Sequence, residues 1–580
     1  MNLSGIEKFA VSTRRNLTVA VDAALSKLGF TADGKTPEKP IALPGGCVYQ
    51  GDTISDETFV ARWESLNSLI SREGRKIAVE RAAYTWFNRL VAIRILAKRH
   101  LIVPQLEWAA NEANVPEIVY RMRTGGGTPN LTPAEDAALA VVRNDPTKTR
   151  EQFAILVGAF CRETPILHAA FGEIDDWTML LVPNNLLSSG GLVDALNDQT
   201  LLSDDDYAKD ELIGWLYQYY IAERKAEVYD GFKKNKKAGT GEIPAATQIF
   251  TPNWIAKYLV ENTVKDEETT FIDPCCGSGH MLLEGFKSLL EKYEEFGYSK
   301  RDAIKNIFEK NLTGVDLDPR ARQLSTFALL IAASREDDSF ADAKILPRVY
   351  DTSTPPADIS TDAVAKALDT SKKDVVYEVC QALALLKDVG DNFGSLIKFD
   401  LSSVARTLLE TRLDFVEDAG LKRSFGLILA LTRNYSAIVT NPPYLGSSNL
   451  NIELKSYLED NFKDGKSDLF AAFIIRLLDM CEKDGRVGMI TMQSWMFLSS
   501  FETLRRKILE ERTILSMLHL GAHAFDSIGG EVTQTTAFIL DSEYLPDYEG
   551  VYYRLVDGQN EAEKEAMFLK AQGVSEGSVE

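Results

Sequence analysis

Cysteine and histidine are scarce in this 580-residue sequence, which contains six cysteines and five histidines. Neither set has the spacing of zinc ligands, and the cysteines are too sparse for a disulfide-stabilised scaffold. No run approaches the ~18 uninterrupted apolar residues of a membrane-spanning helix, and no apolar core follows a basic start as in a secretory signal. We therefore expect reduced thiols, no metal centre, no membrane association and a cytoplasmic location.

Positive charge is also in short supply, because 64 Lys and Arg residues stand against 85 Asp and Glu residues, a formal net charge of −21. Such a chain does not coat nucleic acid indiscriminately, but a local basic face is enough to bind DNA. Two basic runs are candidates, and each has a plainer interpretation as a solvated helix face or a linker. The first contains Arg72, Arg75, Lys76, Arg81, Arg89, Arg94, Lys98 and Arg99, and the second contains Lys233, Lys234, Lys236 and Lys237.

The first part of the chain, residues 1–240, predicts a mostly α-helical N-terminal domain. Apolar residues that recur at three- and four-residue steps mark one buried helix face. They are Val79, Ala83, Trp86, Leu90 and Ile93. A glycine-rich break at residues 125–127 separates two helical blocks, and the polar stretch 233–248 predicts a linker or mobile loop.

The pattern then changes, and short apolar strands alternate with helices over residues 241–545. This alternation predicts βαβ units and an α/β fold with a Rossmann-like parallel sheet covered on both faces. Residues 546–580 predict the truncated start of a further C-terminal region. The predicted strands are residues 270–274, 312–318, 395–401, 435–440, 486–493, 514–521 and 535–540.

A glycine-containing loop follows the first predicted strand, where residues 271–280 are Phe-Ile-Asp-Pro-Cys-Cys-Gly-Ser-Gly-His. Gly277 and Gly279 allow a tight turn and a close approach of a ligand, and the next helix offers free N–H groups. Asp273 at the strand end would repel a phosphate but attract the ammonium group of S-adenosylmethionine (SAM). The loop, which includes Cys275, therefore favours SAM over NAD or ATP.

Two further carboxylates end predicted strands. A carboxylate at the end of the second strand of such a sheet accepts both ribose hydroxyls, and Asp316 is best placed for that. Asp400 ends the predicted third strand and suits the amino group of the cofactor's adenine. The alternative is that each aspartate only caps the helix that follows, but three aspartates at successive strand ends favour a nucleoside ligand.

The motif Asn441-Pro442-Pro443-Tyr444 follows an apolar strand and is the most specific signal in the chain. The prolines fix the backbone and leave outward-facing carbonyls, and Asn441 adds a side-chain carbonyl. Two such acceptors match the two hydrogens of an aromatic amino group and direct its lone pair at an electrophilic methyl group. Tyr444 offers a flat face for a base rotated out of a duplex.

Together these motifs resemble the gamma class of N6-adenine DNA methyltransferases, over residues 245–545. The resemblance implies a Rossmann-like, SAM-dependent methyltransferase sheet, with SAM as cofactor and a flipped adenine of double-stranded DNA as substrate. Residues 247–252 are similar to the family's segment that closes over the methionine end of SAM, which implicates Thr247 and the backbone of Phe250 and Thr251. Residues 467–470 and 485–494 resemble its later motifs.

More narrowly, the helical N-terminal block and the sequence around NPPY resemble the PglX family, the adenine methyltransferases of BREX phage-exclusion systems. That resemblance implies marking of host DNA at a short site, with other BREX defence proteins as partners. The family continues with a large C-terminal domain that reads sequence. The stretch between Glu336 and Asp391 is long for a link between the second and third strands, which makes Asp400 the least secure assignment.

Three alternatives stay open. Glu223 and Lys225 form the E-x-K pattern of many nucleases, with Asp206 upstream, which would suit a fused restriction enzyme and methyltransferase. The NPPY motif also fits other planar nitrogens, namely N4 of cytosine, N2 of guanine in RNA and a glutamine amide. Finally, the chain could be a catalytically silent SAM-binding scaffold of a defence complex, an idea that methyl-transfer assays on oligonucleotides would test.

Overall fold

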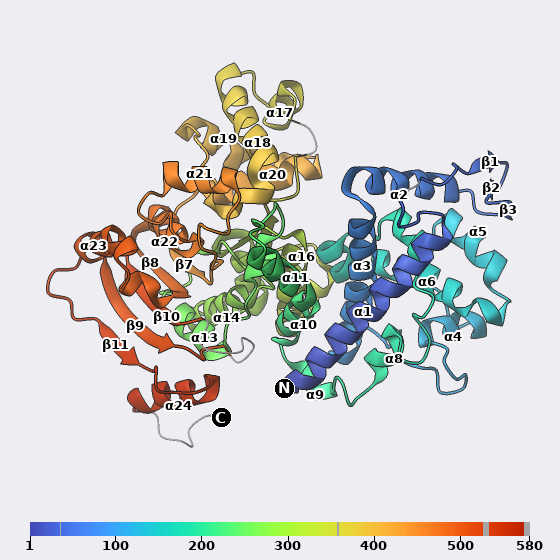
Figure 1. Ribbon diagram of the computed structural model, residues 1–580, viewed down its shortest axis with the longest axis horizontal. Coiled ribbons are helices and arrows are strands. Elements are labelled where there is room, and N and C mark those ends of the chain that lie inside the picture. The colour runs from blue at the N-terminus through green and yellow to red at the C-terminus, as the bar shows by residue number, and fades with distance from the viewer. Residues whose placement is uncertain (35, 357–358, 526–532, 574–580) are drawn as a thin grey trace. The chain divides into compact units, whose positions relative to one another are not determined.

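The computed structural model describes residues 1–34, 36–356, 359–525 and 533–573, and Figure 1 shows their arrangement. The chain divides into two compact units. One comprises Met1–Tyr220 with Ala341–Ala343, and the other comprises Ile221–Phe340 with Lys344–Glu580. The predicted boundary at residue 240 thus lies about one helix inside the second unit, because helix α11 (Ala222–Lys233) belongs to it.

The first unit is mostly helical, as predicted, with one small antiparallel sheet. The apolar face predicted between residues 77 and 96 is buried in helix α3, and Trp86 is fully enclosed. The helices are α1 (Leu3–Lys27), α2 (Phe59–Glu73), α3 (Arg75–Lys98), α4 (Glu117–Thr124), α5 (Pro133–Val142), α6 (Thr149–Glu163), α7 (Pro165–Phe171), α8 (Leu192–Asn197), α9 (Asp204–Ala208) and α10 (Leu212–Tyr220), and the strands are β1 (Ile41–Leu43), β2 (Gly46–Tyr49) and β3 (Asp52–Ile54).

None of the described helices, taken singly, combines the length and apolar character needed to cross a bilayer. The segments Pro146–Glu163 and Pro165–Phe171 are long and apolar enough only when they are taken together, and they are bent by 89° relative to each other.

The second unit is built on an eight-stranded sheet of order β11-β9-β10-β8-β7-β4-β5-β6. Strands β4 to β8 are parallel, whereas β10 is antiparallel to both β8 and β9. This confirms the predicted Rossmann-like α/β fold. The strands are β4 (Phe271–Asp273), β5 (Leu312–Asp316), β6 (Arg348–Asp351), β7 (Tyr435–Thr440), β8 (Cys481–Met492), β9 (Thr513–Gly521), β10 (Thr535–Asp541) and β11 (Val551–Arg554).

Helices flank this sheet, and its central strands are buried on both faces, so that Ile272 of β4 and Ile438 of β7 are fully enclosed. This is why these strands are continuous apolar runs in the sequence. The helices after α11 are α12 (Ile243–Thr247), α13 (Asn253–Glu261), α14 (His280–Glu295), α15 (Lys300–Asn306), α16 (Pro319–Glu336), α17 (Thr361–Ala367), α18 (Lys373–Phe393), α19 (Ser403–Arg412), α20 (Ala419–Thr432), α21 (Ile452–Asn461), α22 (Leu469–Met480), α23 (Glu502–Glu511) and α24 (Glu561–Ala571).

The prediction that residues 395–401 form the third strand is wrong. The third strand is β6, which pairs in parallel with β5. Its sequence, Arg-Val-Tyr-Asp, has one aliphatic residue and therefore no apolar run to detect. Helices α17 to α20 then form a subdomain with its own apolar core before β7, which explains the long stretch after Glu336.

Two segments predicted to be peripheral are packed into the second unit. The predicted linker contains Ala238, which is buried, and its N–H donates to the carbonyl of Asn449 at 2.8 Å. Beyond residue 546, β11 pairs with β9, and Phe568 of α24 contacts the rings of Trp254 and Tyr258. Residues 551–571 are therefore packed as part of the second unit.

Candidate functional site

A pocket of about 910 Å³, counting space open to solvent, lies where β4, β5 and β7 end. The strand order reverses at β4, since β5 and β6 lie on one side of it and β7 and β8 on the other. Open parallel sheets bind ligands at such a switch point, beyond the carboxyl ends of the strands. The described lining includes the predicted residues Thr247, Phe250, Thr251, Asp273, Cys275, Gly277, Asp316 and Asn441.

The glycine loop after β4 has the backbone conformation that its sequence predicts. Gly277 and Gly279 have φ values of +53° and +90°, which favour glycine. A Cβ on Gly277 would lie 2.9 Å from the side-chain nitrogen of Gln248, and one on Gly279 would lie 3.0 Å from Ser325. The positive φ thus disfavours a side chain at both positions, and the packing of Ser325 adds a steric restriction at Gly279.

Asp273 is buried at the end of β4, and its Oδ1 accepts hydrogen bonds from the Thr440 hydroxyl at 2.7 Å and the Cys275 N–H at 3.1 Å. Burial is the main cause that raises the pKa of Asp273 to about 7. Because Thr440 directly precedes the NPPY motif, this bond joins the glycine loop to that motif.

Asp316 ends β5 and is also buried. Its Oδ2 accepts the N–H of Gly277 and its Oδ1 accepts the N–H of Asp318, each at 2.8 Å. Burial raises the pKa of Asp316 to about 7 despite these bonds. Each oxygen keeps a further lone pair, so the carboxylate is oriented and can still accept two hydroxyl groups.

The segment 247–252 covers the same pocket. Its Phe250 ring stacks on His280, the first residue of α14, with ring centroids 4.5 Å apart and planes within 4°. The Nε2 atom of His280 lies 2.9 Å from Oδ1 of Asn253. These contacts hold the segment against the glycine loop.

Asn441 and Pro443 of the NPPY motif line the pocket. The side-chain nitrogen of Asn441 donates to the Thr251 hydroxyl at 3.1 Å and to the Ile249 carbonyl at 3.4 Å. Its side-chain oxygen accepts the hydroxyl of Tyr444 at 2.6 Å. Asn441 is therefore held in one orientation, with one acceptor position left on its oxygen.

Tyr444 lies beside the pocket and is partly buried. Its hydroxyl, whose single proton is donated to Asn441 at the shorter distance, also lies 3.1 Å from the Ile490 carbonyl oxygen. Its ring meets Phe470 edge to face with centroids 6.4 Å apart. Burial and the nearby Asp468 raise its pKa well above the usual value, so the hydroxyl stays protonated. That Tyr444 stacks on an extruded base remains a prediction, as does the role of Pro442.

Residues 392–396 complete the pocket and were missed by sequence reasoning, whereas Asp400 is exposed and does not line it. The Ser395 hydroxyl donates to the Pro274 carbonyl, which ties this turn to the glycine loop. Asn392 is buried and donates to Glu453 at 2.9 Å. The glycine at 394, which has a φ of +56°, was the one local signal for a turn here.

Most cations of the first basic run are engaged within their own unit. Arg89 and Arg94 are buried, and Arg89 donates to carbonyls of helix α7, including that of Phe171 at 2.8 Å. Arg94 and five further cations of the run pair with carboxylates of the same unit. These pairs are Arg72 and Arg81 with Glu73, Arg75 with Asp22, Arg94 with Glu107, Lys98 with Asp204, and Arg99 with Asp210.

The second basic run is also engaged, since Lys233 pairs with Asp230 and Lys236 with Glu242. The nuclease pattern finds no support either. Lys225 lies on helix α11 and donates to the Gln248 carbonyl at 3.0 Å. Across the part of the chain that the structure describes, no group of three or more His, Cys, Asp or Glu side chains is arranged for a metal ion.

Two protein families match the sequence. Residues 227–365 match the family described as N-6 DNA Methylase, and residues 310–525 match the Eco57I restriction-modification methylase. The adenine-specific methyltransferase PglX of Lacticaseibacillus casei is 32% identical over 98% of this chain and 53% of its own length. The adenine-specific methyltransferase BrxX of Escherichia coli is 31% identical over 97% and 52%. The chain thus spans about half the length of these relatives.

Solved structures are more distant. The DNA-bound Type ISP restriction-modification enzyme LlaBIII has a TM-score of 0.43 and 12% identity, covering 97% of this chain and 31% of that one. A methyltransferase subunit of a type I restriction-modification system from Streptococcus thermophilus has a TM-score of 0.41 and 16% identity, covering 89% and 92%. With TM-scores below 0.5, neither bears on the chemistry of the pocket.

Proposed function

We propose that this chain, which is similar to the N-6 DNA methylases, transfers a methyl group from SAM to N6 of adenine in double-stranded DNA. The observation that carries the proposal is a single pocket that contains both Asp316, suited to a nucleoside, and Asn441, suited to an amino group. Either residue alone could belong to a structural turn. A cavity that contains both has room for the methyl donor beside Asp316 and for the methyl acceptor beside Asn441.

The residues of the pocket fit SAM. Asp316 has an acceptor position left on each oxygen for the two ribose hydroxyls. Asp273 places a carboxylate beside the glycine loop, where an ammonium group would neutralise it. The side-chain-free surface of Gly277 allows close approach of the ligand. Bound there, SAM supplies an electrophilic methyl group.

Asn441 acts on the other reactant. Its oxygen has one acceptor position left for an N–H of the target amino group. A carbonyl of the following prolines would accept the second. Holding both hydrogens turns the nitrogen lone pair out of the ring plane and toward the methyl group. The acceptors also stabilise positive charge that develops on this nitrogen, so no strong base is needed before transfer.

The bonds of Asn441 to Ile249 and Thr251 suggest how the two reactants are coordinated. The segment that covers the SAM pocket and the residue that grips the base hold each other. The extruded adenine would be read by Asn441 and stacked on Tyr444, which offsets part of the few kcal/mol of lost stacking.

We place this activity in the cytoplasm, in marking host DNA at a short site together with other proteins of a BREX defence system. The support is the likeness to PglX and BrxX over nearly the whole of this chain. The runner-up is a SAM-binding scaffold without catalysis. The oriented Asn441 favours catalysis over it, because a scaffold has no need of an acceptor aimed into the pocket.

Product analysis tests the proposal directly. Genomic DNA from cells with and without the gene is divided into two portions. One is digested to nucleosides to identify modified bases, and the other is sequenced intact to locate them. We expect N6-methyladenine at one short sequence only when the gene is present. N4-methylcytosine instead would refute the adenine assignment, and normal SAM binding by the purified protein without any methylated base would favour the scaffold.

A further inference from the structure

A second hollow lies at the opposite end of the strands from the NPPY motif. The proposed function assigns it no role. It measures about 600 Å³, counting space open to solvent. Arg433 and Asn434, which directly precede β7, and Met480, which directly precedes β8, contribute to its lining. It therefore lies at the amino ends of these strands, whereas the NPPY motif follows the carboxyl end of β7.

Basic side chains dominate this hollow, in a protein whose net charge is −21. Four cations line it, namely Lys398, Arg406, Arg433 and Arg476, against one carboxylate, that of Asp479. The Lys398 ammonium pairs with Asp479 at 2.8 Å, which satisfies that carboxylate. Three guanidinium groups therefore line the hollow, none of them in an ion pair with a carboxylate of its described wall, and positive charge remains in excess.

Arg476 is built into the protein as a fixed part of this wall. Its side chain is buried, and its Nε and Nη2 donate to the carbonyls of Ser395, Ile397 and Leu431 at 3.3, 3.1 and 2.6 Å. No hydrogen bond of Nη1 occurs among the described residues, so this N–H pair is left for the hollow. A buried guanidinium without a carboxylate partner is costly, and a bound anion would offset that cost.

Arg406 and Arg433 stand at the mouth, half-buried. Within the described ranges, the side chain of neither makes a hydrogen bond or an ion pair. Arg433 also borders a neighbouring hollow that contains Glu267 and Glu309. These carboxylates offset part of its positive charge. Arg406 is therefore the cation most committed to this site.

We propose that this hollow is a binding site for a phosphate group. Forked guanidinium donors match tetrahedral oxyanions in charge and geometry, and the neutral side chains of Thr432 and Asn434 add polar atoms to the wall. The phosphate is not that of the target nucleotide. Strand β7 separates the hollow from NPPY by six residues, about 20 Å at about 3.3 Å per residue.

The site is also connected to the SAM pocket through Arg476. Its carbonyl partners Ser395 and Ile397 flank Leu396, and both Ser395 and Leu396 line the SAM pocket. An anion bound to Nη1 of Arg476 would change the strength of the hydrogen bonds that the same guanidinium donates to that turn. Occupancy of the site is therefore expected to alter SAM affinity.

Calorimetry of the 580-residue protein with inorganic phosphate at constant ionic strength tests the proposal. We expect one saturable site per chain, and Arg406→Gln should weaken it at least about tenfold, the scale of one charge-assisted hydrogen bond. Arg406→Lys, which keeps the charge, should weaken it less. Arg506→Gln on the exposed face of α23 is the matched control and should leave it unchanged.

Competition identifies the source of the phosphate. A short DNA duplex that displaces inorganic phosphate from the wild-type protein, but binds the Arg406→Gln variant less well, would assign the site to the DNA backbone. Displacement by pyrophosphate but not by the duplex would assign it to a small phosphorylated ligand. Non-saturable binding, or equal binding by Arg406→Gln and Arg506→Gln, would overturn the proposal. Because each assay reads phosphate binding alone, the result is independent of methyl transfer.

Discussion

The arginines of helix α3 and the carboxylates that end β4 and β5 are both buried charges, but their hydrogen-bonding capacity is used differently. Arg89 donates to carbonyls of its own unit, and Arg94 pairs with Glu107. Asp273 and Asp316 each accept two described backbone or side-chain hydrogen bonds and keep lone pairs that face a pocket. A buried charged group whose hydrogen-bonding positions are all used within the protein stabilises the fold. A buried charged group that keeps a free donor or acceptor position at a cavity can bind a ligand.

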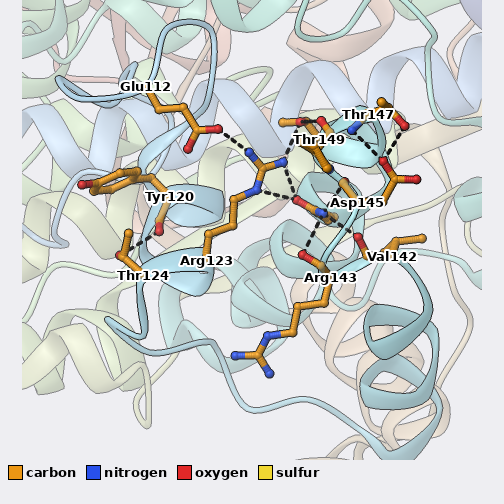
Figure 2. A network of polar contacts seen from close by, with 11 residues as sticks. Glu112, Tyr120, Arg123, Thr124, Val142, Arg143, Asp145, Thr147 and Thr149 are labelled. Carbon is orange, nitrogen blue, oxygen red and sulfur yellow. Dashed lines mark hydrogen bonds and ion pairs between the residues drawn. The ribbon is translucent and has the colours of Figure 1, made fainter.

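Arg123 of helix α4 extends this contrast. Figure 2 shows its guanidinium pointing between Glu112 and Thr149, and it donates to them at 2.6 and 2.7 Å. It also donates twice to the side chain of Gln152. Arg143 in the same view extends its side chain away from the network and is exposed. Arginine in this unit is thus mainly a cross-link between helices.

The largest contrast is expected from Asn441→Ala. It removes an acceptor that acts mainly in the transition state, so kcat should fall by about 10²-fold or more while SAM affinity is retained. Steady-state methylation and calorimetry with SAM measure the two effects. Asn461→Ala at the exposed end of α21 is the control. A normal rate for the Asn441→Ala enzyme would show that the NPPY mechanism is wrong.

For the first unit, Arg94→Met should lower stability without changing DNA binding. It leaves Glu107 without its partner, at a cost of about 3 kcal/mol, the lower end for a buried pair because Glu107 is partly exposed. The apparent Tm should fall by about 6–12 °C in thermal unfolding of the full chain. Arg143→Met is the matched control. Reduced DNA affinity with an unchanged Tm would contradict this expectation and would show that helix α3 contacts DNA.

Asp316→Asn should weaken SAM by about 1.5–3 kcal/mol, the scale of a hydrogen bond to a charged group, which is about ten- to a hundredfold in Kd. The methylation rate at saturating SAM should change less. Calorimetry measures the affinity, with Asp338→Asn on an exposed turn as control. Equal affinities for both variants would contradict the ribose assignment.

The pH dependence of SAM binding follows from the raised pKa values of Asp273 and Asp316, both about 7 in the free site. The ionised carboxylates bind SAM, so affinity should fall as pH decreases below about 7, by up to about tenfold per pH unit for each group. The same shifts mean that the free protein loses stability as pH rises from about 4 to 7, where folding holds protons that the unfolded chain releases. Asp316→Asn should flatten the affinity profile, and a pH-independent affinity in the wild type would contradict this view.

The smallest effect is expected from Tyr444→Phe, which removes the hydroxyl that orients Asn441 but keeps the ring. A lost hydrogen bond of about 0.5–1.5 kcal/mol predicts a decrease in kcat of about two- to tenfold. Tyr444→Ala also removes the predicted stacking face, and its extra defect should shrink when the target adenine lies opposite a mismatch. A defect that does not depend on the mismatch would assign Tyr444 to packing alone.

Local patterns predicted many of the residues that line the pocket. Gly277, Gly279 and the NPPY motif each act through the backbone that they impose, and strand ends bring Asp273 and Asp316 to one edge of a parallel sheet. The third strand and residues 392–396 could not be predicted, because β6 lacks an apolar run and a four-helix subdomain separates it from β7. Asp400 was therefore assigned to a strand end that does not exist.

What the sequence determined by itself is the order of strands and loops and the residues that each loop carries, since periodicity and turn chemistry are local. Only the tertiary structure decided which charged side chains are paired within the protein, because the partners of Arg94 and Arg99 lie 13 and 111 residues away. The same holds for the bond between Asn441 and Thr251, which are 190 residues apart. Contacts at such separations depend on how the elements pack, and no local pattern specifies them.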